Sequence, residues 1–195
     1  MGLWKKIGEI ALILILAVYV VNGINTIPRL DEKVKAAWSQ VDNQYQRRMD
    51  LIPNLVETVK GYANFEKSTL TDVINARASA TKITLSPAML SNPEAFKQYQ
   101  QAQDALSGTL SRLMVVSEKY PDLKANEQFI ALQSQLEGTE NRIAIARQDY
   151  IDTVQEYNTT VRTFPGVLWA SIYGAKPKEV FTSAEGADKP PTVKF

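Results

Sequence analysis

The chain contains no cysteine and no histidine among its 195 residues. Without cysteine it can form no disulfide, no thiol nucleophile and no thiolate metal centre. Without histidine it lacks the commonest metal ligand and the usual general base. We therefore expect no metal ion, no cofactor and no enzymatic activity.

The chain also lacks an excess of charge of either sign, because it contains 22 Lys and Arg and 21 Asp and Glu, for a net charge of +1. Proteins that bind nucleic acid normally carry a basic stripe and a high pI. The balance excludes that class, and we expect no nucleic-acid partner.

Charge is missing altogether from Ile10 through Pro28. As a helix this run would extend roughly 29 Å, about the thickness of the hydrocarbon core of a bilayer. It predicts a single transmembrane helix in residues 1–28, which includes Ile10, Leu14, Val18, Val21 and Ile24. The alternative is a cleaved signal peptide, although the uncharged run is longer than most signal-peptide cores.

Basic residues flank this run on both sides: Lys5 and Lys6 precede it, and Arg29, Lys33 and Lys35 follow it. A short basic leader usually stays in the cytoplasm. We expect the domain after the run to lie on the extracytoplasmic side.

After Pro28, apolar residues recur every three or four positions, which is typical of an amphipathic helix. The pattern continues in phase across Pro53 and reaches Leu70, Val73 and Ala80. Pro53 has no N–H, and its ring crowds the carbonyl of Met49. The helix therefore either kinks at Pro53 or restarts there as a hairpin with Asp50 as its cap.

Two further helices follow a loop at residues 84–93. One begins at Asn92–Pro93 and ends before Pro121, and the last extends over residues 126–163. Long amphipathic helices with short connections predict an all-α fold, an antiparallel four-helix bundle over residues 29–164. Residues 165–195 should form a short apolar helix and an extended tail.

Polar residues that fall on the apolar stripes are candidate interior groups: Glu66, Arg77, Glu140 and Arg147. They would form either a structural ion network that fixes helix register or paired carboxylates for acid–base chemistry. We favour the structural network, because no nucleophile or metal-ligand set accompanies them.

Arg47 and Arg48, beside Asp50, are expected on a solvated helix face, with binding of a lipid headgroup or a partner carboxylate as the alternative. Apolar residues also lie outside the bundle helices, where they usually indicate an interface. We expect these to dock on the bundle or on a neighbouring subunit: Trp169, Ile172, Tyr173, Phe181 and Phe195.

Several strings of this sequence closely resemble the LemA family of bacterial proteins. They include AWSQVD at 37–42, QRR-x-DLIPNLV at 46–56, KGYA at 60–63, LEGTENRIA at 136–144 and P-x-V-x-F at 191–195. The signature residues of the first helix are Trp38, Arg47, Arg48, Asp50, Pro53 and Tyr62. The resemblance implies a membrane-anchored antiparallel helical bundle and brings no enzymatic activity with it.

The combined hypothesis is a non-enzymatic scaffold, anchored in the bilayer of the bacterial inner membrane by one span, that self-associates as a homo-oligomer. The alternative is an adaptor that binds another membrane or envelope protein. A remote alternative is a hydrolase that uses the carboxylates inside the bundle.

Overall fold

Helices make up most of the computed structural model, which describes residues 2–62 and 65–182. They are α1 (Gly2–Lys60), α2 (Lys67–Lys82), α3 (Pro93–Ser117), α4 (Pro121–Lys124), α5 (Glu127–Arg162) and α6 (Gly166–Tyr173), with a short 3-10 helix, η1 (Pro87–Met89), before α3. No strand occurs in the described residues, so the all-α prediction is confirmed.

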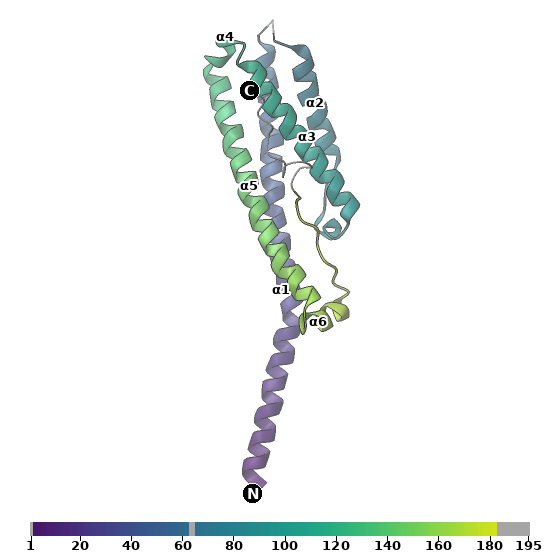
Figure 1. Ribbon diagram of the computed structural model, residues 1–195. Helices are drawn as coiled ribbons and strands as arrows, with labels where there is room; N and C mark the ends of the chain where they lie inside the picture. The colour runs from purple at the N-terminus through teal and green to yellow at the C-terminus, as the bar shows by residue number, and fades with distance from the viewer. Residues whose placement is uncertain (1, 63–64, 183–195) are drawn as a thin grey trace, which may run out of the picture.

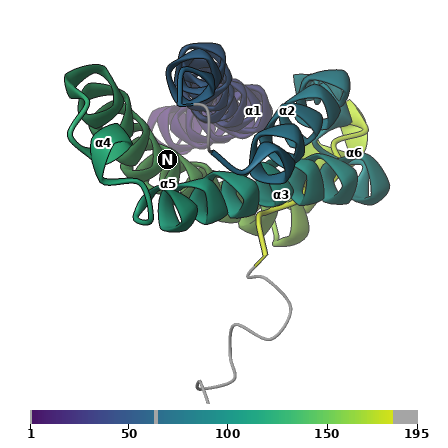
Figure 2. The same cartoon turned by 90° about the horizontal axis from the view of Figure 1, so that it is seen from above.

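The longest helix, α1, forms the spine of the molecule. Its N-terminal part stands alone, and its C-terminal part packs chiefly against α5, while α2 packs against α3 (Figure 1). Seen along the spine, α1, α2, α3 and α5 lie around one core (Figure 2). The short α6 contacts both α1 and α5 where the lone part of α1 leaves the other helices.

The free part of α1 has the character of a membrane-crossing segment. Residues 6–22 are exposed along their whole length, and α1 is the helix in the described chain that is long and apolar enough to cross a membrane. The apolar positions named from the sequence, Ile10, Leu14, Val18, Val21 and Ile24, are all exposed. Exposing so many large apolar groups to water would be unfavourable, so this part of α1 is suited to the apolar interior of a membrane.

The core consists of two apolar clusters stacked along α1. The lower cluster, near α6, includes Trp38, Tyr45 and Tyr150, and the upper cluster includes Ile52 and Phe129. Aromatic rings dominate the lower cluster, where the ring centroids of Trp38 and Tyr150 are 5.4 Å apart in an edge-on arrangement. Burial of such rings outweighs most other contributions to the stability of a core.

Asparagine caps begin two of the core helices. The side-chain Oδ1 of Asn92 accepts hydrogen bonds from the backbone N–H groups of Glu94 and Ala95, both at 3.1 Å, and the side chain of Asn126 accepts from Phe129 N. Each cap satisfies N–H groups that have no partner within the helix, an effect of about 1 kcal/mol.

Pro53 neither ends α1 nor turns it back, so the hairpin alternative is wrong. The expectation that one stripe continues to Ala80 is also wrong, because α1 ends at Lys60 and α2 begins at Lys67. Pro53 lacks the N–H that would bind the carbonyl of Met49. Arg77 of α2 replaces it, since its Nε donates to that Met49 oxygen at 3.0 Å.

We therefore expect Arg77→Met to lower the free energy of unfolding by about 1–3 kcal/mol, because the half-buried Met49 carbonyl loses its donor. Replacing Pro53 by alanine restores the backbone N–H, so Arg77→Met should be less harmful in a Pro53→Ala background. Thermal melts of the four variants, followed by circular dichroism, measure this coupling. Arg112→Met, an exposed arginine paired with Asp72, is the control. Equal losses in both backgrounds would contradict the assignment.

Candidate functional site

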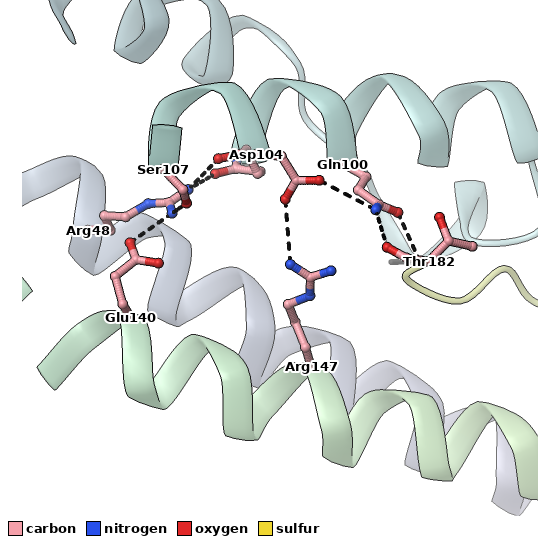
Figure 3. Close-up of polar contacts among 8 residues, drawn as sticks. Arg48, Gln100, Asp104, Ser107, Glu140, Arg147 and Thr182 are labelled. Carbon is pink, nitrogen blue, oxygen red and sulfur yellow. Dashed lines mark hydrogen bonds and ion pairs between the residues drawn. The ribbon is translucent and has the colours of Figure 1, made fainter. Parts of the chain in front are cut away.

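Arg48 is a charged side chain with no exposed surface. Its Nη1 donates to Glu140 Oε1 at 2.9 Å and to Ser107 Oγ at 2.5 Å (Figure 3). Its Nη2 donates to the side-chain oxygen of Gln103 at 2.6 Å and to the Gln103 carbonyl at 3.3 Å. The guanidinium also lies 5.0 Å from the ring of Tyr45, a cation–π contact. We call Arg48, Gln103, Ser107 and Glu140 the Arg48 cluster; it joins α1, α3 and α5.

The Arg48 cluster separates the two apolar clusters of the core. On α1, Tyr45 belongs to the lower cluster and Ile52 to the upper one, and on α5 the corresponding residues are Ile143 and Leu136. Moving an ion out of water is favourable only when it is paired and hydrogen-bonded. The three helices must therefore meet at this level, which fixes their register.

The sequence interpretation of Arg48 as part of a solvated face is wrong. Arg48 follows Tyr45 by three residues and precedes Ile52 by four, so it occupies the buried stripe itself. That spacing was the available signal. Its neighbours Arg47 and Asp50 are exposed, as a solvated face requires.

A second ion pair lies about two turns further along α5 and reaches the C-terminal segment. Arg147 Nη1 is 3.6 Å from Asp104 Oδ1, and Gln100 donates to Asp104 at 3.4 Å and to the Thr182 carbonyl at 2.7 Å (Figure 3). The guanidinium of Arg147 lies 4.3 Å from the centre of the Phe181 ring. This group therefore ties α3 and α5 to the chain beyond α6.

Residues 175–182, the docked tail, lie against the lower cluster. Phe181 is buried beside Trp38 with 6.2 Å between ring centroids. The Tyr150 hydroxyl donates to the Glu179 carbonyl at 2.9 Å, and burial raises the pKa of Tyr150, which keeps that donor protonated. Asn158 exchanges two 2.8 Å hydrogen bonds with the backbone of Lys178.

The four polar residues singled out on the stripes do not form one layer. Glu140 joins the Arg48 cluster and Arg147 joins Asp104, whereas Arg77 binds the Met49 carbonyl. Glu66 is exposed at the start of α2 and accepts a hydrogen bond from Ser68. It lies outside the stripe because α1 ends six residues before it.

The remaining signature residues support the lower and upper ends of the core. Trp38 is buried and donates from Nε1 to the Leu85 carbonyl at 3.1 Å. The Tyr62 hydroxyl donates to the Asp122 carbonyl at 3.4 Å. Pro53 is exposed on α1.

The apolar residues placed outside the bundle have different surroundings. Phe181 docks within its own chain, and Trp169 packs on the lower cluster. Ile172 and Tyr173 are exposed at 72% and 47%. Phe195 lies outside the described residues.

An open groove of about 530 Å³ lies beside Glu140, between α3 and α5. Its walls combine apolar and small polar side chains: Ser107, Leu110, Ser111, Met114, Leu136, Glu137, Glu140 and Asn141. The carboxylate of Glu140 is already engaged by Arg48. Within residues 2–62 and 65–182, no three acidic residues gather as metal ligands. The groove can bind a side chain or a peptide, and it presents no nucleophile–base pair.

These features define a membrane-associated, all-helical protein whose interior charges hold helices together. The LemA family model matches residues 37–195, and the chain belongs to the LemA family.

Three similar proteins are identical to this chain at about a quarter of the aligned positions. Magnetosome protein MamQ 2 of Paramagnetospirillum magneticum is 26% identical over 182 residues, which cover 85% of this chain and 67% of that protein. Magnetosome protein MamQ of Magnetospirillum gryphiswaldense is 25% identical with the same coverage. Protein LemA of Metamycoplasma hominis is 24% identical over 140 residues, which cover 72% of this chain and 60% of that protein.

Removing the acidic partner of Arg48 should destabilise the fold strongly. Glu140→Ala leaves a buried guanidinium without its counter-charge, and we expect a loss of about 3–5 kcal/mol in unfolding free energy. Glu140→Gln keeps a hydrogen-bond acceptor and should lose less. Chemical denaturation of each variant measures the difference. Glu137→Ala, an exposed position on the same helix, should be nearly neutral; an equal loss there would show that the effect is not specific to Arg48.

Asp31 should make the docking of the tail depend on pH. Burial alone raises the pKa of its carboxyl, but hydrogen bonds and charges from Lys178 and Lys35 outweigh burial, so the pKa is lowered on folding. A carboxyl whose pKa is lower in the folded state stabilises the fold at every pH above its pKa in the unfolded chain. This contribution is lost as the pH falls through the folded pKa.

We therefore expect Asp31→Asn to lower the melting temperature at pH 7. The difference from the unchanged protein should shrink as the pH falls below about 4. Melts at pH 7, 5 and 3 measure it, and a difference that stays constant over this range would refute the role of Asp31.

Proposed function

We propose that the protein is a non-enzymatic scaffold, held by a single span in the bacterial inner membrane with its bundle on the extracytoplasmic side, that self-associates as a homo-oligomer. The observation that carries the proposal is the continuity of α1 from Gly2 to Lys60. Anchor and spine are one helix, about 88 Å long at 1.5 Å per residue. Such a connection holds the bundle at a fixed orientation to the membrane, so that neighbouring copies would present the same surfaces to one another.

The pairing of charges between helices also supports a structural role. Arg48 pairs with Glu140 and Arg147 pairs with Asp104, and both pairs connect helices or tail. A hydrolase that used the interior carboxylates would have to release Glu140 from a fully buried arginine, which is unfavourable.

Apolar side chains on the outer faces of the bundle offer contacts for a second copy. Ile130 and Ile145 of α5 are exposed at 51% and 63%. Burial of such groups between copies is favourable, at about 25 cal/mol per Å² of apolar surface.

The mass of the detergent-extracted full chain, measured by light scattering or mass photometry, tests the proposal. We expect a defined homo-oligomer. The variant Ile130→Lys/Ile145→Lys should give a smaller mass without a loss of melting temperature, because both positions are exposed. Gln135→Lys, at another exposed position of the same helix, is the control. A monomer at every concentration would refute self-association.

The second candidate is an adaptor for another membrane or envelope protein. The groove between α3 and α5 favours it, because its floor includes Leu110 and Leu136 and its rim is polar. Grooves of this composition accept amphipathic helices. A monomer that is isolated together with one other membrane protein, and loses it in Leu110→Glu, would support the adaptor over the scaffold.

A further inference from the structure

The helix α6 and the residue Phe164 just before it carry exposed apolar side chains that have no partner in the described chain. Phe164, Leu168 and Ile172 are exposed at 79%, 53% and 72%. Val167 and Tyr173 are exposed at 40% and 47%. We call these five residues the α6 apolar face. No charged residue occurs from Thr163 through Ala175, while Arg162 and Lys176 bracket the segment.

The position of α6 is fixed by a close contact with α1. A Cβ on Gly23 would lie 2.3 Å from Nε1 and 2.6 Å from Cε2 of Trp169, so only glycine leaves room for the indole. A Cβ on Gly166 would lie 2.1 Å from the Thr160 carbonyl oxygen, which folds α6 closely onto the end of α5. The helix is therefore held against α1 at the level of Gly23 (Figure 1).

That level lies within the charge-free run of α1. Gly23 is 13 residues beyond Ile10, or about 20 Å along a helix. The hydrocarbon core of a bilayer is about 30 Å thick. If Ile10 marks one boundary of this core, Gly23 lies about 10 Å inside the other.

We propose that α6 lies in the membrane interface as a second, non-spanning contact with the lipid, and that its apolar face enters the acyl region beside α1. An interfacial helix typically buries its apolar face by about 5–10 Å, and basic flanks attract anionic headgroups. Arg162 and Lys176 supply these flanks, together with Arg29 and Lys33 of α1. All four residues are exposed. Two contacts at a fixed angle prevent the bundle from tilting freely about a single helix.

The inference requires that α1 enters the bilayer, as the proposed function has it, but it does not require self-association. A second copy of the chain could also cover the α6 apolar face. The two occupants differ in what reaches a probe on Ile172: lipid admits oxygen, whereas a protein contact excludes it.

The absence of cysteine allows a test on the full chain without background labelling. Ile172→Cys, Leu168→Cys, Ile15→Cys and Val115→Cys are each given a nitroxide label and reconstituted in vesicles of phosphatidylcholine and phosphatidylglycerol. Electron paramagnetic resonance then compares collisions with oxygen, which concentrates in lipid, and with a water-soluble nickel chelate. Ile15 lies on the bare part of α1, and Val115 lies on α3 at the far end of the bundle.

We expect the labels at positions 168 and 172 to lie about 5–10 Å below the phosphate layer. The label at 15 should also lie in lipid, about 8 Å inside the boundary at Ile10, and that at 115 should be in water. A label at 172 as accessible to nickel as that at 115 would overturn the inference while leaving the span intact if position 15 remains in lipid. A label at 172 that is shielded from both reagents would assign the face to a second copy and would also overturn it. A label at position 15 in water would refute the anchor itself.

Discussion

A buried arginine charge organises the bundle. Arg48 has no exposed surface, and its hydrogen-bond partners come from α3 and α5. A buried ion of this kind does not by itself add stability, because well-packed apolar groups could replace it. It does require that the helices which carry its partners be correctly aligned. Sliding any of the three helices by one turn would leave the guanidinium unpaired. The two apolar clusters can therefore pack in one register only.

The same helix that carries Arg48 also leaves the bundle as the apolar N-terminal segment. The Arg48 cluster is thus connected to the charge-free run, which ends at Pro28, by about twenty residues of continuous helix. Pro28 and Pro53 lie inside α1 without ending it. At Pro53 the missing N–H is replaced by the side chain of Arg77, so the interruption becomes a contact between helices.

Much of the fold could be predicted from the sequence because it depends on local patterns. The uncharged run and the apolar periodicity predicted the course of α1 but not its end at Lys60, whereas the start at Asn92–Pro93 and the stripe over residues 126–163 located α3 and α5 closely. The break between the end of α1 at Lys60 and the start of α2 at Lys67 could not be found in this way, since the apolar pattern resumes in phase after it and Gly61 alone is a weak signal. Likewise, Pro53 permitted two outcomes that only the contact with Arg77 distinguishes.

The candidate site was less predictable, because it depends on pairing between distant residues. Glu140, Arg147 and Arg48 could all be recognised by their spacing as polar groups on an apolar stripe, but the pairing of Glu140 with Arg48 and of Arg147 with Asp104 could not be predicted. Periodicity places a residue on a face and does not identify what faces it. The docking of Phe181 in its own chain has the same origin: its contacts with Trp38 and Arg147 join segments far apart in sequence.

The most direct test of this account is a double-mutant cycle between Arg48→Met and Glu140→Leu, with unfolding free energies measured by chemical denaturation of the full chain. If the pair fixes register by requiring mutual compensation, the double variant recovers much of the stability that Glu140→Leu alone loses, because no buried charge remains. A double variant whose loss equals the sum of the two single losses would contradict it.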